Sequence, residues 1–141
     1  MVRTGLMIAA AALIVALPAS STPSSAQSSA QAPAQEAGPM VVEIQLRNYA
    51  FTPSTVHLRR GVPVVLRLVD AGGSHSFSAP ELFAASTLDP TTAALIRDGK
   101  VEVREGGVEL RLTPNTTGSY AFRCTHFMHS AFGMKGTVIV D

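Results

Sequence analysis

Short strand-like runs, each closed by a turn signal, recur from residue 41 to the end of this chain. Val41–Arg47 alternates polar and apolar residues, and Val64–Val69 is rich in β-branched residues. Such runs are typical of strands, and many short strands separated by turns are typical of sandwiches. We therefore expect an all-β chain folded as a Greek-key β-sandwich.

A short helical insertion interrupts the strands. Residues 80–86 form one candidate helix. A second is expected over residues 91–98, because Asp89 is a favourable N-cap and Pro90 suits the first helical position. Gly99 follows directly and ends that run.

The glycine pair at 106–107 predicts a turn between two further strands. Lys100–Glu105 and Val108–Leu112 alternate on either side of it, which is the pattern of a β-hairpin. Farther on, Tyr120, Phe122 and Cys124 are spaced by two and fall on one face of a strand.

The first part of the chain has a different composition. Residues 1–26 combine an early arginine, a short apolar run and a small-residue site ending at Ala26, which together predict a secretory signal peptide cleaved there. Residues 27–39 are mostly Ala, Gln, Ser, Pro and Gly and predict a flexible linker. We expect one folded domain over residues 40–141, exported to the periplasm, with no stable membrane insertion of the mature form.

The net charge and the number of cysteines limit the classes of function that the chain can have. The formal net charge is +1, and Lys and Arg are scattered, so the basic stripe that nucleic-acid binding requires is absent from the sequence. A single cysteine cannot form an internal disulfide. In an exported protein, an unpaired Cys indicates a reactive or metal-bound thiol.

Three soft donor residues lie on one loop between two strand-like runs. Cys124 is followed by His129 and then by Met134, each five residues on. Copper that changes oxidation state favours a thiolate and two imidazoles in a plane with a distant thioether. The second imidazole must come from elsewhere, and His75, which follows a strand and a Gly-Gly turn, is well placed to supply it.

These motifs resemble the cupredoxins, the plastocyanin and azurin superfamily of type 1 copper proteins. The resemblance rests on the Cys-(x)4-His-(x)4-Met loop, the strand that leads into it, the Gly-Met-Lys-Gly ending and the upstream histidine. It implies one copper ion per domain, with His75 and His129 as imidazole ligands, Cys124 as the thiolate and Met134 as the axial thioether.

Two features depart from the plastocyanin and azurin pattern. Ser76 follows the upstream histidine where those families usually place Asn; rusticyanins are similar in this serine and in the loop spacing, which implies a relatively high reduction potential. His126 and Met128 lie inside the ligand loop as rival donors. The family's spacing favours His129, and His126 is then a solvent-facing or neighbouring histidine. We expect His57 to be an ordinary surface residue.

The expected function is one-electron transfer between redox partners, by a monomer. Partners would dock near His129 and Phe132, where Phe127 and Ala131 add apolar surface, although these side chains could instead cap the core. The alternative is a periplasmic copper chaperone or copper-resistance protein, with His126 and Met128 assisting delivery. An enzyme is not expected, because copper enzymes need further histidine-rich centres and the chain has four histidines.

Overall fold

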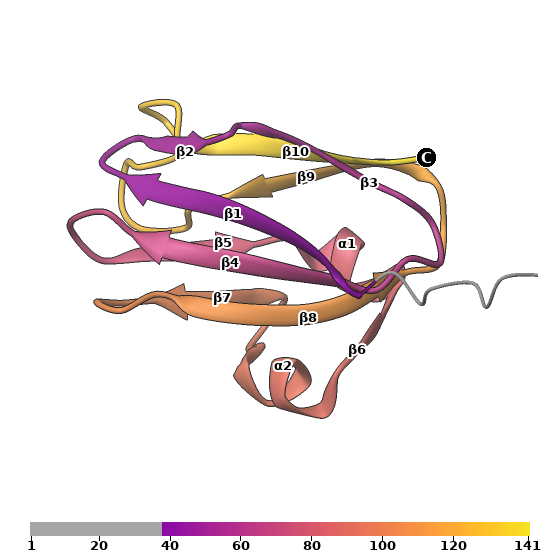
Figure 1. Cartoon of the computed structure of the whole chain (residues 1–141). Helices are drawn as coiled ribbons and strands as arrows, with labels where there is room; N and C mark the ends of the chain where they lie inside the picture. The colour runs from indigo at the N-terminus through magenta and orange to yellow at the C-terminus, as the bar shows by residue number, and fades with distance from the viewer. Residues whose placement is uncertain (1–37) are drawn as a thin grey trace, which may run out of the picture. The chain divides into compact units, whose positions relative to one another are not determined.

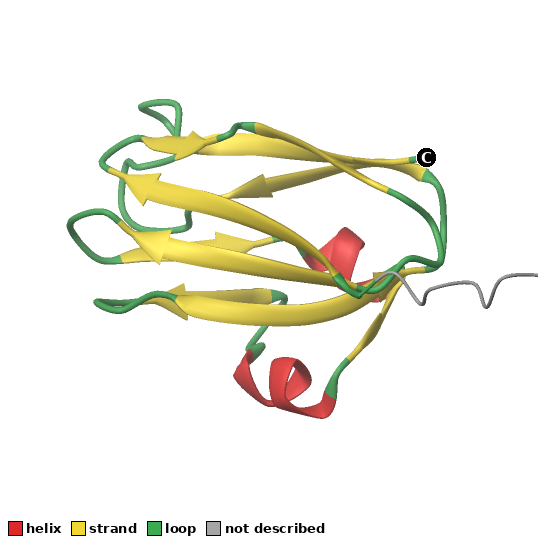
Figure 2. Cartoon of the chain, viewed as in Figure 1, coloured by secondary structure: helices red, strands yellow, loops and turns green. Residues whose placement is uncertain are grey.

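The computed structural model describes residues 38–141, which form two five-stranded β-sheets facing one another (Figure 1). The predicted signal peptide and nearly all of the predicted linker lie outside the described residues. The strands are joined by loops and two short helices (Figure 2). The all-β sandwich expected from the sequence is confirmed.

The first sheet has the strand order β2-β1-β4-β8-β6. Its strands are β1 (Met40–Arg47), β2 (Ala50–Thr52), β4 (Val64–Asp70), β6 (Ser86–Leu88) and β8 (Val108–Pro114). β1 and β4 run parallel, whereas β4 and β8 are antiparallel. The sheet is therefore mixed, with β4 at its centre.

The second sheet has the order β3-β10-β9-β5-β7 and carries the candidate metal centre described below. Its strands are β3 (Thr55–Leu58), β5 (His75–Ser78), β7 (Lys100–Val103), β9 (Gly118–Arg123) and β10 (Lys135–Val140). β5 pairs fully with β7 but meets β9 only at Ser78 and Arg123. The ladder between β5 and β9 is thus open toward the end where the ligand loop lies.

The core consists of the inward side chains of both sheets. In β1 buried and more exposed residues alternate, and Ile44 and Leu46 are fully buried; in β4 Val64, Val65 and Leu66 are all buried, as is Leu68. Three aromatic rings pack edge-on or tilted in the core between the two sheets, with centroid distances of 5.0–6.1 Å: Phe51 of the first sheet, and Phe77 and Phe122 of the second. Burial of such rings is a major stabilising term in a domain of this size.

The helical insertion has the predicted cap but a shorter second helix. α1 spans Pro80–Ala84 and α2 spans Pro90–Leu95. The Asp89 side chain accepts a hydrogen bond from the Thr91 N–H at 2.9 Å, which confirms it as the N-cap. The helix ends before residue 98 because Ile96 is extended, and a tight turn with left-handed Asp98 and Gly99 follows.

The predicted hairpin around Gly106-Gly107 is wrong. β7 pairs with β5 in the second sheet, and β8 pairs with β4 and β6 in the first, so the chain crosses from one sheet to the other here. Gly107 passes directly over β4: a Cβ built on it would lie 2.3 Å from the Leu68 carbonyl oxygen. The glycines therefore permit a sheet crossover and not a hairpin turn.

Among the described residues, no helix has the length and apolar character needed to cross a membrane.

Candidate metal centre

His75, Cys124 and His129 converge at one end of the second sheet. One donor atom from each lies within 4.8 Å of the other two. The thiol Sγ of Cys124 is 3.5 Å from Nδ1 of His129, and the rings of His75 and His129 have centroids 5.3 Å apart. Of the described residues, these three form the one group of His, Cys, Asp or Glu donors that is close enough to share an ion.

His75 is the first residue of β5 and is fully buried. Its Nε2 lies 3.0 Å from the carbonyl oxygen of Gly72, in the loop before β5. A carbonyl only accepts hydrogen bonds, so Nε2 carries the proton, and the Asp70 carboxylate 3.9 Å away favours the same tautomer. The other nitrogen, Nδ1, is then unprotonated, and it is buried without a hydrogen-bond partner among the described residues.

Cys124 directly follows β9 and is fully buried. Its thiol accepts a contact from the backbone N–H of Ser76 at 3.5 Å, from the strand that carries His75. The Ser76 hydroxyl lies 2.9 Å from the Thr125 hydroxyl and accepts a hydrogen bond from the Thr125 N–H at 2.8 Å. Ser76 therefore ties the strand that carries His75 to the segment that follows Cys124.

His129 lies midway along the loop from Cys124 to Met134 and is half-buried. Burial lowers the pKa of its imidazole, and the nearby His75 and His126 lower it further. A lowered pKa keeps the ring neutral, the form that can donate a lone pair to a metal.

Met134, the fourth candidate ligand, is fully buried. Its N–H donates to the His129 carbonyl, and its own carbonyl accepts from the Cys124 N–H, both at 3.0 Å. The main chain of Met134 is therefore hydrogen-bonded to Cys124 and to His129, which holds in place the segment that carries the thioether.

The rival donors lie outside this group. His126 Nε2 contacts the Glu102 carboxylate at 3.0 Å, and this hydrogen bond is the main reason that the pKa of Glu102 is lowered. Met128 is 45% exposed and has a left-handed backbone. His57 is an exposed residue 3.8 Å from Asp141, as expected of a surface histidine.

An exposed apolar patch lies around His129, and it includes one residue that the sequence analysis missed. Phe127 is 90% exposed and Phe132 is 59% exposed, so these rings do not cap the core. Tyr49, from the turn between β1 and β2, packs edge-on against both His129 and Phe132. Tyr49 is distant in sequence from the loop, and no local motif marks it. We call Tyr49, Phe127, Met128 and Phe132 the apolar patch.

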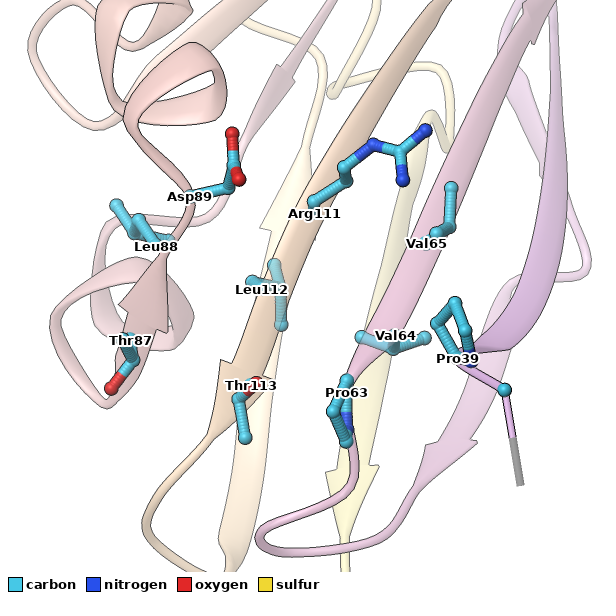
Figure 3. Close-up of a pocket in the computed structure, with 11 residues that line it drawn as sticks. Pro39, Pro63, Val64, Val65, Thr87, Leu88, Asp89, Arg111, Leu112 and Thr113 are labelled. Carbon is cyan, nitrogen blue, oxygen red and sulfur yellow. The ribbon is translucent and has the colours of Figure 1, made fainter. Parts of the chain in front are cut away.

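One surface groove lies apart from these residues. It has a volume of about 820 Å³ and crosses β6, β8 and β4, where Leu88, Arg111 and Val65 line it (Figure 3). Its lining contains none of the donor residues. This groove is therefore no part of the candidate metal centre.

The donor set fits a copper ion. A thiolate and two imidazoles match the in-plane ligands of type 1 centres. The unpartnered Nδ1 of His75 also fits a bound metal ion. A buried nitrogen without a hydrogen bond lowers the stability of the folded protein unless another group or an ion binds it.

The comparisons with known proteins agree with this geometry. The sequence matches the family described as cupredoxin-like domain over residues 7–140. The chain belongs to the cupredoxin-like family. The resemblance expected from the ligand loop is thereby confirmed, and membership of this family implies a copper site. A comparison with curated proteins finds none that matches the chain.

Solved structures with the same fold include three auracyanins. Auracyanin B is 22% identical, with a TM-score of 0.52 over 72% of this chain and 88% of its own. Dithionite-reduced auracyanin from Roseiflexus castenholzii is 19% identical, with a TM-score of 0.52 over 72% and 97%. Auracyanin A from Chloroflexus aurantiacus, a "blue" copper protein, is 19% identical, with a TM-score of 0.50 over 74% and 100%. At these identities the likeness shows the cupredoxin fold.

Proposed function

We propose that this protein is an exported one-electron carrier in which His75, Cys124, His129 and Met134 would hold one type 1 copper ion. The observation that carries the proposal is the convergence of three donor atoms within 4.8 Å at the end of a rigid sandwich. Family membership and the blue copper neighbours support electron transfer as the function.

The fold holds the donor residues in place through contacts that involve no metal. The Gly72 carbonyl orients the His75 ring, and the Ser76 N–H contacts the Cys124 thiol. The main chain of Met134 is hydrogen-bonded to Cys124 and to His129. Bound copper would supply a couple between its two oxidation states. Because the ligand residues are fixed beforehand, the protein rearranges little as the charge changes, and this favours fast electron transfer.

Redox partners would dock on the apolar patch in the periplasm. Its rings are exposed, Tyr49 packs against His129, and His129 is the one of the three donor residues that is not fully buried. A small apolar surface suits the transient complexes that electron carriers form. The monomeric state is part of the same proposal.

Addition of Cu(II) to the metal-free protein tests the function. We expect an intense visible absorption band and a narrow copper hyperfine splitting at one equivalent, followed by a reversible voltammetric wave at the high end for the family. Met134→Leu should retain copper and raise the potential, because the axial ligand tunes it. Absence of the visible band would contradict the proposal. Rapid loss of reduced copper to a Cu(I) chelator would favour copper delivery.

Self-exchange between oxidised and reduced molecules tests the docking surface without a known partner. Phe132→Lys should slow self-exchange by about tenfold or more, because two patches would then bring like charges together. Leu95→Lys is the matched control, since Leu95 is also exposed, at 44%, but lies on α2. Equal rates in the two variants would place docking elsewhere.

A further inference from the structure

The start of the ligand loop is attached to two adjacent strands at paired positions. Ser76 of β5 and Glu102 of β7 are register partners in the antiparallel ladder. Ser76 binds Thr125, and Glu102 binds His126. Two consecutive loop residues, directly after Cys124, are therefore each bonded to one member of a cross-strand pair.

These two attachments differ in burial. Ser76 is fully buried, whereas the side chains of His126 and Glu102 are 28% and 41% exposed. Glu102 is itself oriented, because its second oxygen lies 3.1 Å from the Lys100 ammonium. The His126–Glu102 contact is thus the outer attachment of the loop, and water can reach it.

The outer attachment is linked directly to a donor residue. The carbonyl of His126 accepts the N–H of His129 at 3.1 Å, which closes the turn that places the His129 ring. The His126 and His129 rings are 5.6 Å apart. Release of His126 from Glu102 would free the near end of that turn while Ser76 still holds Thr125.

We propose that the His126–Glu102 contact is a positioning device that keeps the turn of residues 126–129 closed over the metal centre and so limits the rate at which copper enters and leaves. The inference rests on the proposed function, because it assigns copper to this centre. Exposed ion pairs add little to global stability. The effect therefore falls on local opening of the turn and not on unfolding of the domain.

The test compares copper exchange in paired variants of the full chain after removal of its leader. His126→Ala and Glu102→Ala should each speed Cu(I) loss to excess chelator and Cu(II) uptake by the apoprotein, by about two- to fivefold. The double variant should be no faster than either single variant, since both remove one contact. His126→Gln, which keeps a donor, should restore part of the wild-type rate. Arg104→Gln, at an exposed position just past β7, is the control.

A measurement without copper separates this inference from the proposed function. In the apoprotein, amide hydrogen exchange at His129 should be faster in Glu102→Ala than in the wild type, with an unchanged melting temperature. That result would support the positioning role of the His126–Glu102 contact even if the protein formed no type 1 copper centre. Unchanged exchange rates in both assays would overturn the inference. Slower copper uptake in His126→Ala would also overturn it, because His126 would then be an entry ligand.

Discussion

At the scale of single residues, the centre depends on which atom of each donor residue is left free by its neighbours. The Gly72 carbonyl accepts a hydrogen bond from Nε2–H of His75, so Nδ1 is the atom without a partner among the described residues. Cys124 has one N–H contact at its sulfur and no exposed surface. A thiol beside two imidazoles is the in-plane donor set of a type 1 copper centre.

Replacement of the thiolate gives the most direct residue-scale prediction. Cys124→Ser should abolish the intense visible band of the copper-loaded protein, because only a thiolate supplies that charge-transfer donor. His126→Ala should leave the band nearly unchanged. Absorption spectra of both variants at one equivalent of Cu(II) check this. A band lost in His126→Ala but retained in His129→Ala would show that the ligand assignment is wrong.

Replacement of Ser76 should lower the stability of the apoprotein. Ser76→Ala removes the acceptor of the Thr125 N–H and the hydroxyl contact at 2.9 Å. Because Ser76 is fully buried, we expect the free energy of unfolding of the apoprotein to fall by about 1–3 kcal/mol. Urea unfolding measures it, with Ser119→Ala, at an exposed position of β9, as the control. Equal stability of the two variants would contradict a structural role for this tie.

At the scale of secondary-structure elements, the Asp89 carboxylate caps the N-terminus of α2. Hydrogen bonds from the Thr91 side chain and backbone lower the pKa of Asp89 below its usual value. A carboxyl group with a lowered folded-state pKa stabilises the folded protein above its unfolded pKa of about 3.9. That stabilisation is lost as the pH falls through the folded-state value.

Asp89→Asn tests this pH dependence, because Asn can still cap the helix but does not titrate in this range. The difference in free energy of unfolding between wild type and Asp89→Asn should be largest at neutral pH and shrink below about pH 4. Urea unfolding at a series of pH values from neutral to acid measures the difference. A constant difference across the acid range would show that the Asp89 charge does not support α2.

The crossover between the sheets gives a second element-scale prediction. Gly106 and Gly107 both have left-handed backbones, but only Gly107 would bring a Cβ against β4. Gly106→Ala should cost about 1–2 kcal/mol for the backbone strain alone. Gly107→Ala should cost about 1–3 kcal/mol more, because of the clash with Leu68. Thermal and urea unfolding of the two variants compare them, and equal losses would contradict the close approach.

At the scale of the whole molecule, export remains a prediction from the first 26 residues. We expect the mature protein to begin near Gln27. N-terminal sequencing of the protein purified from a periplasmic fraction measures this. An intact Met1 on membrane-embedded protein would contradict both the cleavage and the periplasmic location.

The sequence by itself determined the sandwich, the family and the candidate ligands. Strand alternation is local, with a period of two, so a single sequence records it in β1 and at the end of β9. The ligand loop is also local, because Cys124, His129 and Met134 lie within eleven positions. The Asp89 cap was predictable for the same reason, since its partner Thr91 is two residues away.

Only the tertiary structure decided the pairings between distant segments. The alternation around Gly106-Gly107 is the same whether the two flanking strands pair with each other or belong to different sheets. The pairing of β7 with β5 and of β8 with β4 distinguishes the two arrangements, and Gly107 lies close to Leu68 where the chain crosses. Tyr49 against His129 and Glu102 against His126 join residues that no local spacing relates. The tautomer of His75 likewise depends on a carbonyl placed by the fold. Sequence periodicity reports the environment of each strand, whereas the contacts around the metal centre depend on how whole sheets pack.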